Sequence, residues 1–222
     1  MQFTVDHVIR FLERAAALIR DHSIELTELD ALIGDADHGA NLNRGFTAVL
    51  AKLDDLVDED IGTVLDVTGR TLLSTVGGAA GPLYGTAFRR AGALLAGRRI
   101  LESAELVAAL EAALQGVVER GKVRQGEKTM LDAIAPGVET FRDAIAQGVL
   151  LEEAARQALA AVEQGMRATI PMQATKGRAA FLGPRSIGHQ DPGATSAYYI
   201  ACAMVGDVER LMTRSRDVSS AC

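Results

Sequence analysis

Apolar side chains recur along most of the chain at the three-to-four-residue spacing of an amphipathic helix. The first run has Val5, Val8, Ile9, Leu12, Ala16 and Ile19 on one face, with Thr4 placed to cap it. The same spacing predicts seven further helices: through Leu42–Leu53, over Ile61–Val76, from Pro82, over Ser103–Gly121, over Lys128–Gln147 with a kink at Pro136, from Leu151 to an interruption at Pro171, and from Pro192 to about Met212. No stretch alternates strictly between apolar and polar residues, so the pattern predicts an all-α protein.

The connections between these helices are mostly short, which favours antiparallel neighbours. The helices are rich in alanine and glycine, and aromatic residues make up only 4% of the chain. Small residues allow helix backbones to approach closely. Neither an internal repeat nor a linker interrupts the pattern, so residues 1–222 are interpreted as a single domain.

The overall charge narrows the classes of partner. A formal net charge of −6 without a basic stretch argues against binding to nucleic acid. Asp6, Arg10 and Glu13 interrupt the first apolar run, which therefore differs from a signal peptide. The sequence has no run of 18 uncharged apolar residues, so a membrane span is not expected. We therefore expect a cytoplasmic protein.

Three stretches break the helical pattern, and polar or glycine-rich junctions of this kind are where function is expected. They are Leu29–Asn43, Gly77–Gly85 and Ala174–Thr195.

The first stretch concentrates carboxylates. Asp30, Asp35 and Asp37 lie beside Gly34 and Gly39, and carboxylate oxygens are the ligands that Mg²⁺ prefers. The alternative is a solvated loop in which Asp37 caps a helix. An EF-hand is excluded by the spacing, since the twelfth position from Asp35 is Phe46. An aspartyl phosphatase would require an α/β pattern that this chain lacks.

The second and third stretches have the features of anion sites. Gly77–Pro82 precedes a helix, where free N–H groups attract phosphate, although tight packing is an alternative and the P-loop Gly-Lys-Ser/Thr is missing. The third stretch contains Lys176 and Arg178, followed by Asp191–Gly193 at a helix start. Together the three stretches indicate Mg²⁺–nucleotide binding. A kinase can work by positioning and charge neutralisation, so the lack of a Ser–His–Asp or Cys–His set does not exclude phosphoryl transfer.

These stretches resemble the nucleotide-binding domain of dihydroxyacetone kinases. The resemblance rests on GDADHGANLNRGF (Gly34–Phe46), GGAAGPLYGTAF (Gly77–Phe88), GEKTMLDAIAP (Gly126–Pro136) and ATKGRAAFLGPRSIGHQDPGATS (Ala174–Ser196). It implies an antiparallel eight-helix barrel or bundle, with the nucleotide site in the loops at one end.

The resemblance also implies a set of ligands and residue roles. ADP or ATP binds with two Mg²⁺ ions, for which Asp30, Asp35 and Asp37 are the metal ligands. Arg178 contacts phosphate and takes the catalytic role. The nucleotide-contacting positions are His38, Gly39, Ala40, Asn41, Ala79, Ala80, Gly121, Met130, Arg178, Asp191, Pro192 and Gly193. The family often has a hydroxyl residue where this chain has Ala79–Ala80, so phosphate contacts there must come from backbone N–H groups.

The chain length matches the free-standing subunit of the bacterial form of this family. That form implies two partners: a dihydroxyacetone-binding kinase subunit and the phosphohistidine donor subunit of the phosphotransferase system. The alternatives are an ATP-dependent subunit for a related ketose such as erythrulose, and a nucleotide-sensing module that binds a transcription regulator. The helical pattern leaves the oligomeric state open, a homodimer included.

Overall fold

The computed structural model describes the backbone of residues 3–219 and the side chains of residues 3–206. It confirms the all-helical class. The α-helices are α1 (Val5–Asp21), α2 (Ser23–Ile33), α3 (His38–Leu53), α4 (Ile61–Thr75), α5 (Ala80–Leu94), α6 (Ser103–Gly121), α7 (Leu131–Ala146), α8 (Leu151–Ala168) and α9 (Pro192–Ser219). Two 3₁₀ segments, η1 (Asp54–Leu56) and η2 (Arg178–Ser186), and the two-residue strands β1 (Phe3–Thr4) and β2 (Ile100–Leu101) complete the described elements.

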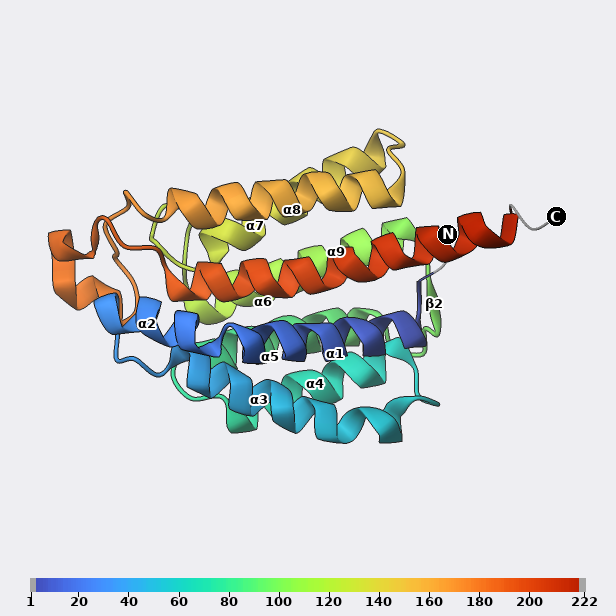
Figure 1. Cartoon of the computed structure of the whole chain (residues 1–222), viewed down its shortest axis with the longest axis horizontal. Coiled ribbons are helices and arrows are strands. Elements are labelled where there is room, and N and C mark those ends of the chain that lie inside the picture. Colours follow the sequence, from blue (N-terminus) through green and yellow to red (C-terminus); the bar gives the residue numbers. More distant parts are fainter. Residues whose placement is uncertain (1–2, 220–222) are drawn as a thin grey trace.

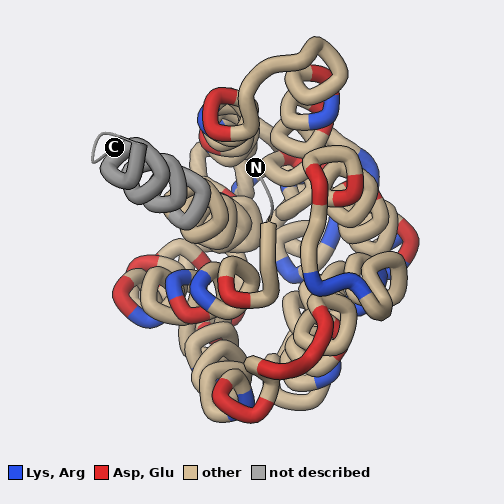
Figure 2. The backbone as a smooth tube through the Cα atoms, turned by 90° about the vertical axis from the view of Figure 1, so that its right-hand side faces the viewer, with Lys and Arg blue, Asp and Glu red and all other residues tan. Residues whose placement is uncertain are grey.

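Eight of the described helices form a closed ring. From α3 to α9 each helix contacts the next in the sequence, and α1 contacts both α3 and α9. Short connections make successive helices run in opposite directions, and α1 and α9 are also antiparallel (Figure 1). Figure 2 views the ring from the end at which β1 and β2 lie. The helix α2 lies outside this order, at the opposite end, where it packs on α3, α9 and η2.

The inner faces of the ring are apolar. Leu12, Phe46 and Leu72 are fully buried in the core. The ring also encloses a hollow of about 220 Å³, lined almost entirely by apolar side chains that include Phe11, Phe141 and the ring of Tyr84.

The helix pair α4 and α5 packs through glycines. A Cβ built on Gly69 would lie 2.6 Å from the Gly85 carbonyl oxygen, and one built on Gly85 would lie 2.8 Å from the Gly69 carbonyl oxygen. Gly62 and Gly92 face each other in the same way, with each added Cβ 2.7 Å from the other's carbonyl oxygen. This is the close approach that the small-residue content of the sequence indicates.

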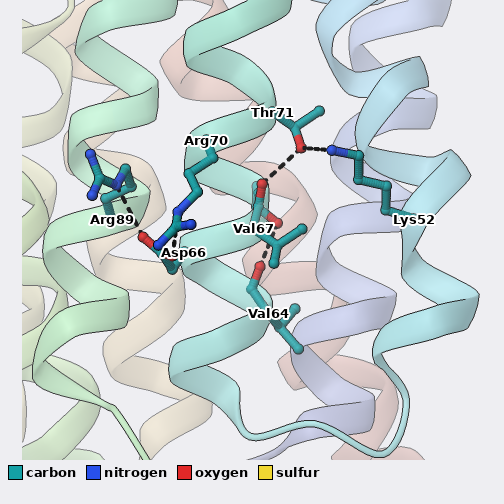
Figure 3. Close-up of polar contacts among 8 residues, drawn as sticks. Lys52, Val64, Asp66, Val67, Arg70, Thr71 and Arg89 are labelled. Carbon is teal, nitrogen blue, oxygen red and sulfur yellow. Dashed lines mark hydrogen bonds and ion pairs between the residues drawn. The ribbon is translucent and has the colours of Figure 1, made fainter.

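Polar contacts join α3, α4 and α5, as Figure 3 shows. The Lys52 ammonium donates to the Thr71 hydroxyl at 2.9 Å, and the Asp66 carboxylate accepts from Arg70 at 2.7 Å and Arg89 at 3.0 Å. Both arginine side chains are largely exposed, and such pairs contribute at most about 1 kcal/mol each. The ring is therefore held mainly by its apolar interior.

The structure corrects several sequence-based boundaries. The helix α2 was not predicted, because only Leu26, Asp30 and Ile33 are buried while Ile24 and Leu32 are exposed. The strand pair is too short to leave an alternating pattern. The helix predicted from Pro82 begins at Ala80.

Two further differences concern the helices after α6. The helix predicted from Lys128 begins at Leu131, and it continues through Pro136 to Ala146. Pro136 has no N–H to offer the Asp132 carbonyl, and Gly165 of α8 packs there instead, since an added Cβ would lie 2.2 Å from that oxygen. The helix α8 ends at Ala168, before Pro171. Among the described residues, every helix is too short or too polar to cross a bilayer.

Candidate functional site

Four helices of the ring begin at the same end of the molecule, the left-hand end in Figure 1. They are α3, α5, α7 and α9, and the backbone N–H groups of helix starts gather there. Two of these N–H groups are already accepted by carboxylates, that of His38 by Asp30 and that of Ala194 by Asp191, and Pro192 at the start of α9 has none. The N-cap residues of α3, α5 and α7 are Asp37, Ala79 and Met130, and none of their side chains makes a capping hydrogen bond. The positive ends of the helix dipoles and these N–H groups make this end favourable for a phosphate-bearing ligand.

A hollow of about 230 Å³ lies at this end. Thirteen of the fifteen residues that the sequence assigns to the site line it: Asp30, Asp35, Asp37, His38, Asn41, Ala79, Ala80, Gly121, Met130, Arg178, Asp191, Pro192 and Gly193. Gly39 and Ala40 do not line it. Gly39 instead packs α3 on α2, since an added Cβ would lie 1.9 Å from the Ser23 carbonyl oxygen. Ala40 is exposed.

The three carboxylates converge. Asp30, Asp35 and Asp37 each offer an oxygen, and these oxygens all lie within 4.8 Å of one another. The buried Asp30 fixes the loop, because its Oδ2 accepts from the backbone N–H groups of Asp37 at 2.9 Å and His38 at 3.2 Å. The arrangement is a set of hard oxygen donors that fits Mg²⁺.

The backbone between the carboxylates is tightly folded. A Cβ on Gly34 would lie 2.0 Å from the Asp30 Oδ1 atom, so only glycine fits at this position. Ala36, between Asp35 and Asp37, has a φ of +60°, which is unfavourable for a residue with a side chain. Strain of this kind is maintained where the surrounding structure over-determines it, as at binding sites.

Basic residues of the third stretch reach this loop. Arg178, at the start of η2, pairs with the Asp35 carboxylate at 2.9 Å. Lys176 is held differently, since its ammonium donates to the Lys122 carbonyl at 2.9 Å on the side of the pocket that Gly121 lines. Of the two, Arg178 is thus the side chain adjacent to the metal-type loop.

The glycine stretch forms the N-terminal entry of α5. Gly78 has a φ of +65° and no atom within 4 Å of an added Cβ, so glycine is required by backbone conformation. Ala79 and Ala80 follow at the N-cap and first position of α5, and both line the pocket.

Asp191 shapes the loop before α9. Its buried carboxylate accepts from the Ala194 N–H at 2.7 Å, and its own N–H donates to the Thr169 hydroxyl at 3.0 Å. Burial raises the pKa of Asp191 to about 7, although the Ala194 hydrogen bond and the Lys128 charge oppose that shift.

Lys128 is a residue of the site that was not predicted from the sequence. Its side chain is 1% exposed, its backbone has a φ of +61°, and it lines the pocket. The ammonium donates to the carbonyls of Thr169, at 2.6 Å, and His189, which joins the loop before α7 to the loops that follow α8. Burial lowers the pKa of Lys128, and the Asp191 charge opposes this shift. The motif Gly126–Pro136 contains Lys128, but the residue types around it identify no chemistry.

A second missed group surrounds His38. Its Nε2 atom lies 2.9 Å from the Ser196 hydroxyl, and the Tyr84 hydroxyl lies 2.8 Å from the same Ser196 oxygen. Burial lowers the pKa of His38, while the charges of Asp30 and Asp37 oppose that shift. Burial raises the pKa of Tyr84. Helical periodicity places Tyr84 and Ser196 in the core and gives no sign of this contact.

The fold and site together define a class: a ring of helices in which a carboxylate cluster and four helix N-termini surround one pocket suited to a magnesium–phosphate ligand. The family model of the DAK2 domain matches residues 32–206. The chain belongs to this family.

Curated relatives cover most of the chain. It is 46% identical, over 90% of its length and 95% of the relative's, to the ADP-binding subunit DhaL of the PEP-dependent dihydroxyacetone kinase of Escherichia coli. It is 31% identical to a D-erythrulose kinase of Mycolicibacterium smegmatis, over 95% of this chain but 36% of that longer protein.

A solved structure supports the fold. The dihydroxyacetone kinase of C. freundii in complex with AMP-PNP and Mg²⁺ matches with a TM-score of 0.69 and 25% identity. The match covers 90% of this chain and 33% of that chain.

Proposed function

We propose that this chain is the nucleotide-binding subunit of a dihydroxyacetone kinase that takes its phosphoryl group from a phosphotransferase donor. The observation that supports this most strongly is the convergence of Asp30, Asp35 and Asp37 within 4.8 Å beside four helix N-termini in one pocket. A nucleoside diphosphate with Mg²⁺ combines the negative phosphates and the hard cation that these two features attract.

The pocket divides into parts with different tasks. Asp30, Asp35 and Asp37 hold two Mg²⁺ ions, and the backbone of Ala79–Ala80 binds phosphate. Gly121 and Met130 line the adenine side, and the segment His38–Asn41 and the loop Asp191–Gly193 complete the nucleotide site. Gly39 and Ala40 do not line the pocket, so their part in this assignment is limited to the backbone that follows the metal-type loop.

The bound nucleotide supplies a phosphoryl relay: ADP accepts the group from the phosphohistidine of the donor subunit, and the resulting ATP passes it to a hydroxyl of dihydroxyacetone on the substrate-binding subunit. The chain's own task is to hold the nucleotide and to neutralise charge. Arg178 is the catalytic residue in this proposal, because its guanidinium lies beside Asp35 and can stabilise the negative charge that develops on the oxygens of the transferred phosphoryl group.

Both partners must reach the phosphate end of the pocket, so they dock on the rim around it. That rim carries exposed apolar side chains, with Phe181 90% exposed on η2 and Leu32 54% exposed on α2. The two elements are packed together through Ile33, Ala179 and Leu182. We therefore assign this rim to the docking of the dihydroxyacetone-binding subunit, and we place the assembly in the cytoplasm.

Relatives named erythrulose kinases are longer than the region that this chain matches. The match covers about a third of their length, whereas it covers 95% of the E. coli ADP-binding subunit. The higher identity to the dihydroxyacetone kinase subunit of E. coli, 46% against 31% for the D-erythrulose kinase, favours dihydroxyacetone as the acceptor.

The test combines mass analysis with reconstitution. Denatured purified protein should release ADP, and dihydroxyacetone phosphate should form when a dihydroxyacetone-binding subunit and a phosphohistidine donor are added with phosphoenolpyruvate and the general phosphotransferase proteins. The Asp35→Asn/Asp37→Asn variant is the matched negative control. Release of no nucleotide, or no product from the complete system, would contradict the proposal.

A further inference from the structure

A buried polar chain crosses the layer between the nucleotide pocket and the apolar interior of the ring. It runs from the His38 imidazole to the Ser196 hydroxyl, and from there to the Tyr84 hydroxyl, with contacts of 2.9 and 2.8 Å. Ser196 is 0% exposed and Tyr84 is 4% exposed. His38 lines the nucleotide pocket and Tyr84 lines the interior hollow.

The three residues lie near the starts of three helices, α3, α5 and α9, and each of these helices follows a different loop of the site. His38 directly follows the metal-type carboxylate Asp37. Tyr84 lies on the first turns of α5, just after the glycine stretch. Ser196 lies on the first turn of α9 and also donates to the carbonyl of Gly193, at 3.0 Å, within the loop before α9. One hydroxyl group thus joins all three loops.

Hydrogen counting gives the chain a direction. Ser196 has one hydrogen, and the Gly193 carbonyl, which can only accept, lies 3.0 Å from its oxygen; with the hydrogen assigned to that contact, two lone pairs are left to accept. Tyr84 donates to one of them, and the other accepts from His38 if the neutral imidazole carries its proton on Nε2. In this arrangement each of the three groups has a complementary partner, and the Pro192 carbonyl is a further acceptor for the His38 ring. It leaves Nδ1 of His38 as an acceptor.

We propose that Ser196 and Tyr84 are positioning residues for phosphoryl transfer, acting through His38 and the Gly193 loop. They fix the metal-type loop, the glycine stretch and the loop before α9 relative to one another, and they hold His38 as its Nε2–H tautomer. The kinetic part of the inference rests on the proposed function. Alignment of phosphate, metal ligands and acceptor matters more in the transition state than in the ground state, so the loss of this chain should slow transfer more than it weakens binding.

The variants are Tyr84→Phe, Ser196→Ala and the double variant. Tyr84→Phe keeps the ring that packs against the interior and removes one hydroxyl. Tyr198→Phe is the matched control, because Tyr198 is also on α9 but does not line the nucleotide pocket. Each variant is measured for thermal unfolding, for Mg²⁺–ADP affinity, and for single-turnover transfer at saturating nucleotide in the reconstituted system.

We expect each single substitution to slow transfer by about 10-fold with less than about 3-fold change in ADP affinity. The double variant should be no slower than Ser196→Ala alone, since both changes break the same chain. Tyr198→Phe should match the unsubstituted protein. Unchanged transfer in both single variants, or slowing that multiplies in the double variant, would overturn the positioning role.

A spectroscopic readout separates this inference from the kinase assignment. Long-range ¹H–¹⁵N spectra of the histidine rings in the Mg²⁺–ADP-bound protein should show His38 as the Nε2–H tautomer, and Ser196→Ala should change that signal while Tyr198→Phe leaves it unchanged. His38→Gln assigns the signal. A His38 signal with the proton on Nδ1, or one insensitive to Ser196→Ala, refutes the chain. If the complete system makes no product but the spectra change as expected, the proposed function fails and the chain stands.

Discussion

Neutralising two of the three converging carboxylates should have opposite effects on the free and the ligand-bound protein. The oxygens of the three carboxylates lie within 4.8 Å of one another, and in Asp35→Asn/Asp37→Asn only the Asp30 charge is left. All three repulsive pairs are therefore removed. At that distance each pair repels by about 0.9 kcal/mol in water and about 3.5 kcal/mol at an effective dielectric constant of 20. Asp35 is partly exposed, so the lower figure applies best.

Two favourable terms are lost in the same variant. The Arg178–Asp35 pair is largely exposed and contributes about 0.5 kcal/mol. The Asp37 charge at the N-terminus of α3 contributes a similar amount, about 0.5 kcal/mol. Relief of the repulsion therefore outweighs these losses, and the ligand-free variant should be more stable by about 1–2 kcal/mol, which for a chain of this size raises the Tm by roughly 2–8 °C.

The response to ligand should disappear. A ligand present at 100 times its Kd stabilises the unsubstituted protein by about 2.7 kcal/mol, or roughly 5–11 °C in Tm. The double variant, without its metal ligands, should show no shift with Mg²⁺–ADP. Differential scanning calorimetry with and without ligand measures both effects. Asp54→Asn/Asp55→Asn, an exposed acidic pair on η1, controls for the change in net charge.

Two results would refute this reasoning separately. A ligand-induced shift retained in the double variant would show that the carboxylates do not hold the metal. A lower Tm for the ligand-free double variant would show that their mutual repulsion is already offset within the folded protein.

Four further predictions concern transfer, partners and pH. Arg178→Ala should slow single-turnover transfer by about 10³-fold while ADP affinity changes far less. Arg185→Ala, on the same 3₁₀ segment, is the control and should change neither the rate nor the affinity. An equal loss of rate and affinity would assign Arg178 to ground-state binding. The isolated chain should form no dihydroxyacetone phosphate until a substrate-binding subunit is added, which a product assay with the purified chain alone checks. Phe181→Ser should weaken binding to that subunit by 10-fold or more, as expected when an exposed aromatic anchor is lost, whereas Leu150→Ser, on an exposed turn at the other end of the ring, should not; calorimetric titration compares them. Burial raises the pKa of Asp191 from 3.8 to about 7, so between these pH values the folded state holds a proton that the unfolded state has lost. The free energy of unfolding should therefore fall as pH rises through this window. Asp191→Asn should flatten that slope in denaturant titrations, and an unchanged slope would show that Asp191 is ionised in the folded protein.

The helical ring could be predicted from the sequence because its apolar positions face one interior. Each helix from α3 to α9 buries a continuous stripe, and that stripe has the period of the helix. The helix α2 could not be predicted in this way, because it covers the end of the ring and exposes Ile24 and Leu32 as well as polar residues. Leu32 is one of the two exposed apolar side chains that we assign to the docking rim.

The site was predictable where residue type alone implies chemistry. Asp30, Asp35 and Asp37 are close in the sequence, so their convergence needed only a local turn. The contacts of Lys128, Ser196 and Tyr84 could not be read in this way. Their partners lie far away in the sequence, and a buried lysine or tyrosine on a helical pattern is identified as a site residue only when its tertiary contacts are known.

The topology of the ring explains why one end can hold a nucleotide. In a closed ring of antiparallel helices, alternate members begin at the same end, so their N-termini gather there without any special sequence. Phosphate is attracted to such an end, and so are carboxylates. The Asp30 carboxylate accepts hydrogen bonds from two N–H groups at the start of α3, and the Asp35 carboxylate forms an ion pair with Arg178. These contacts offset part of the repulsion among the carboxylates, so the metal-type loop can be formed before a cation binds. Binding then requires little reorganisation of the loop, which is the condition for holding a nucleotide tightly through repeated phosphoryl exchange.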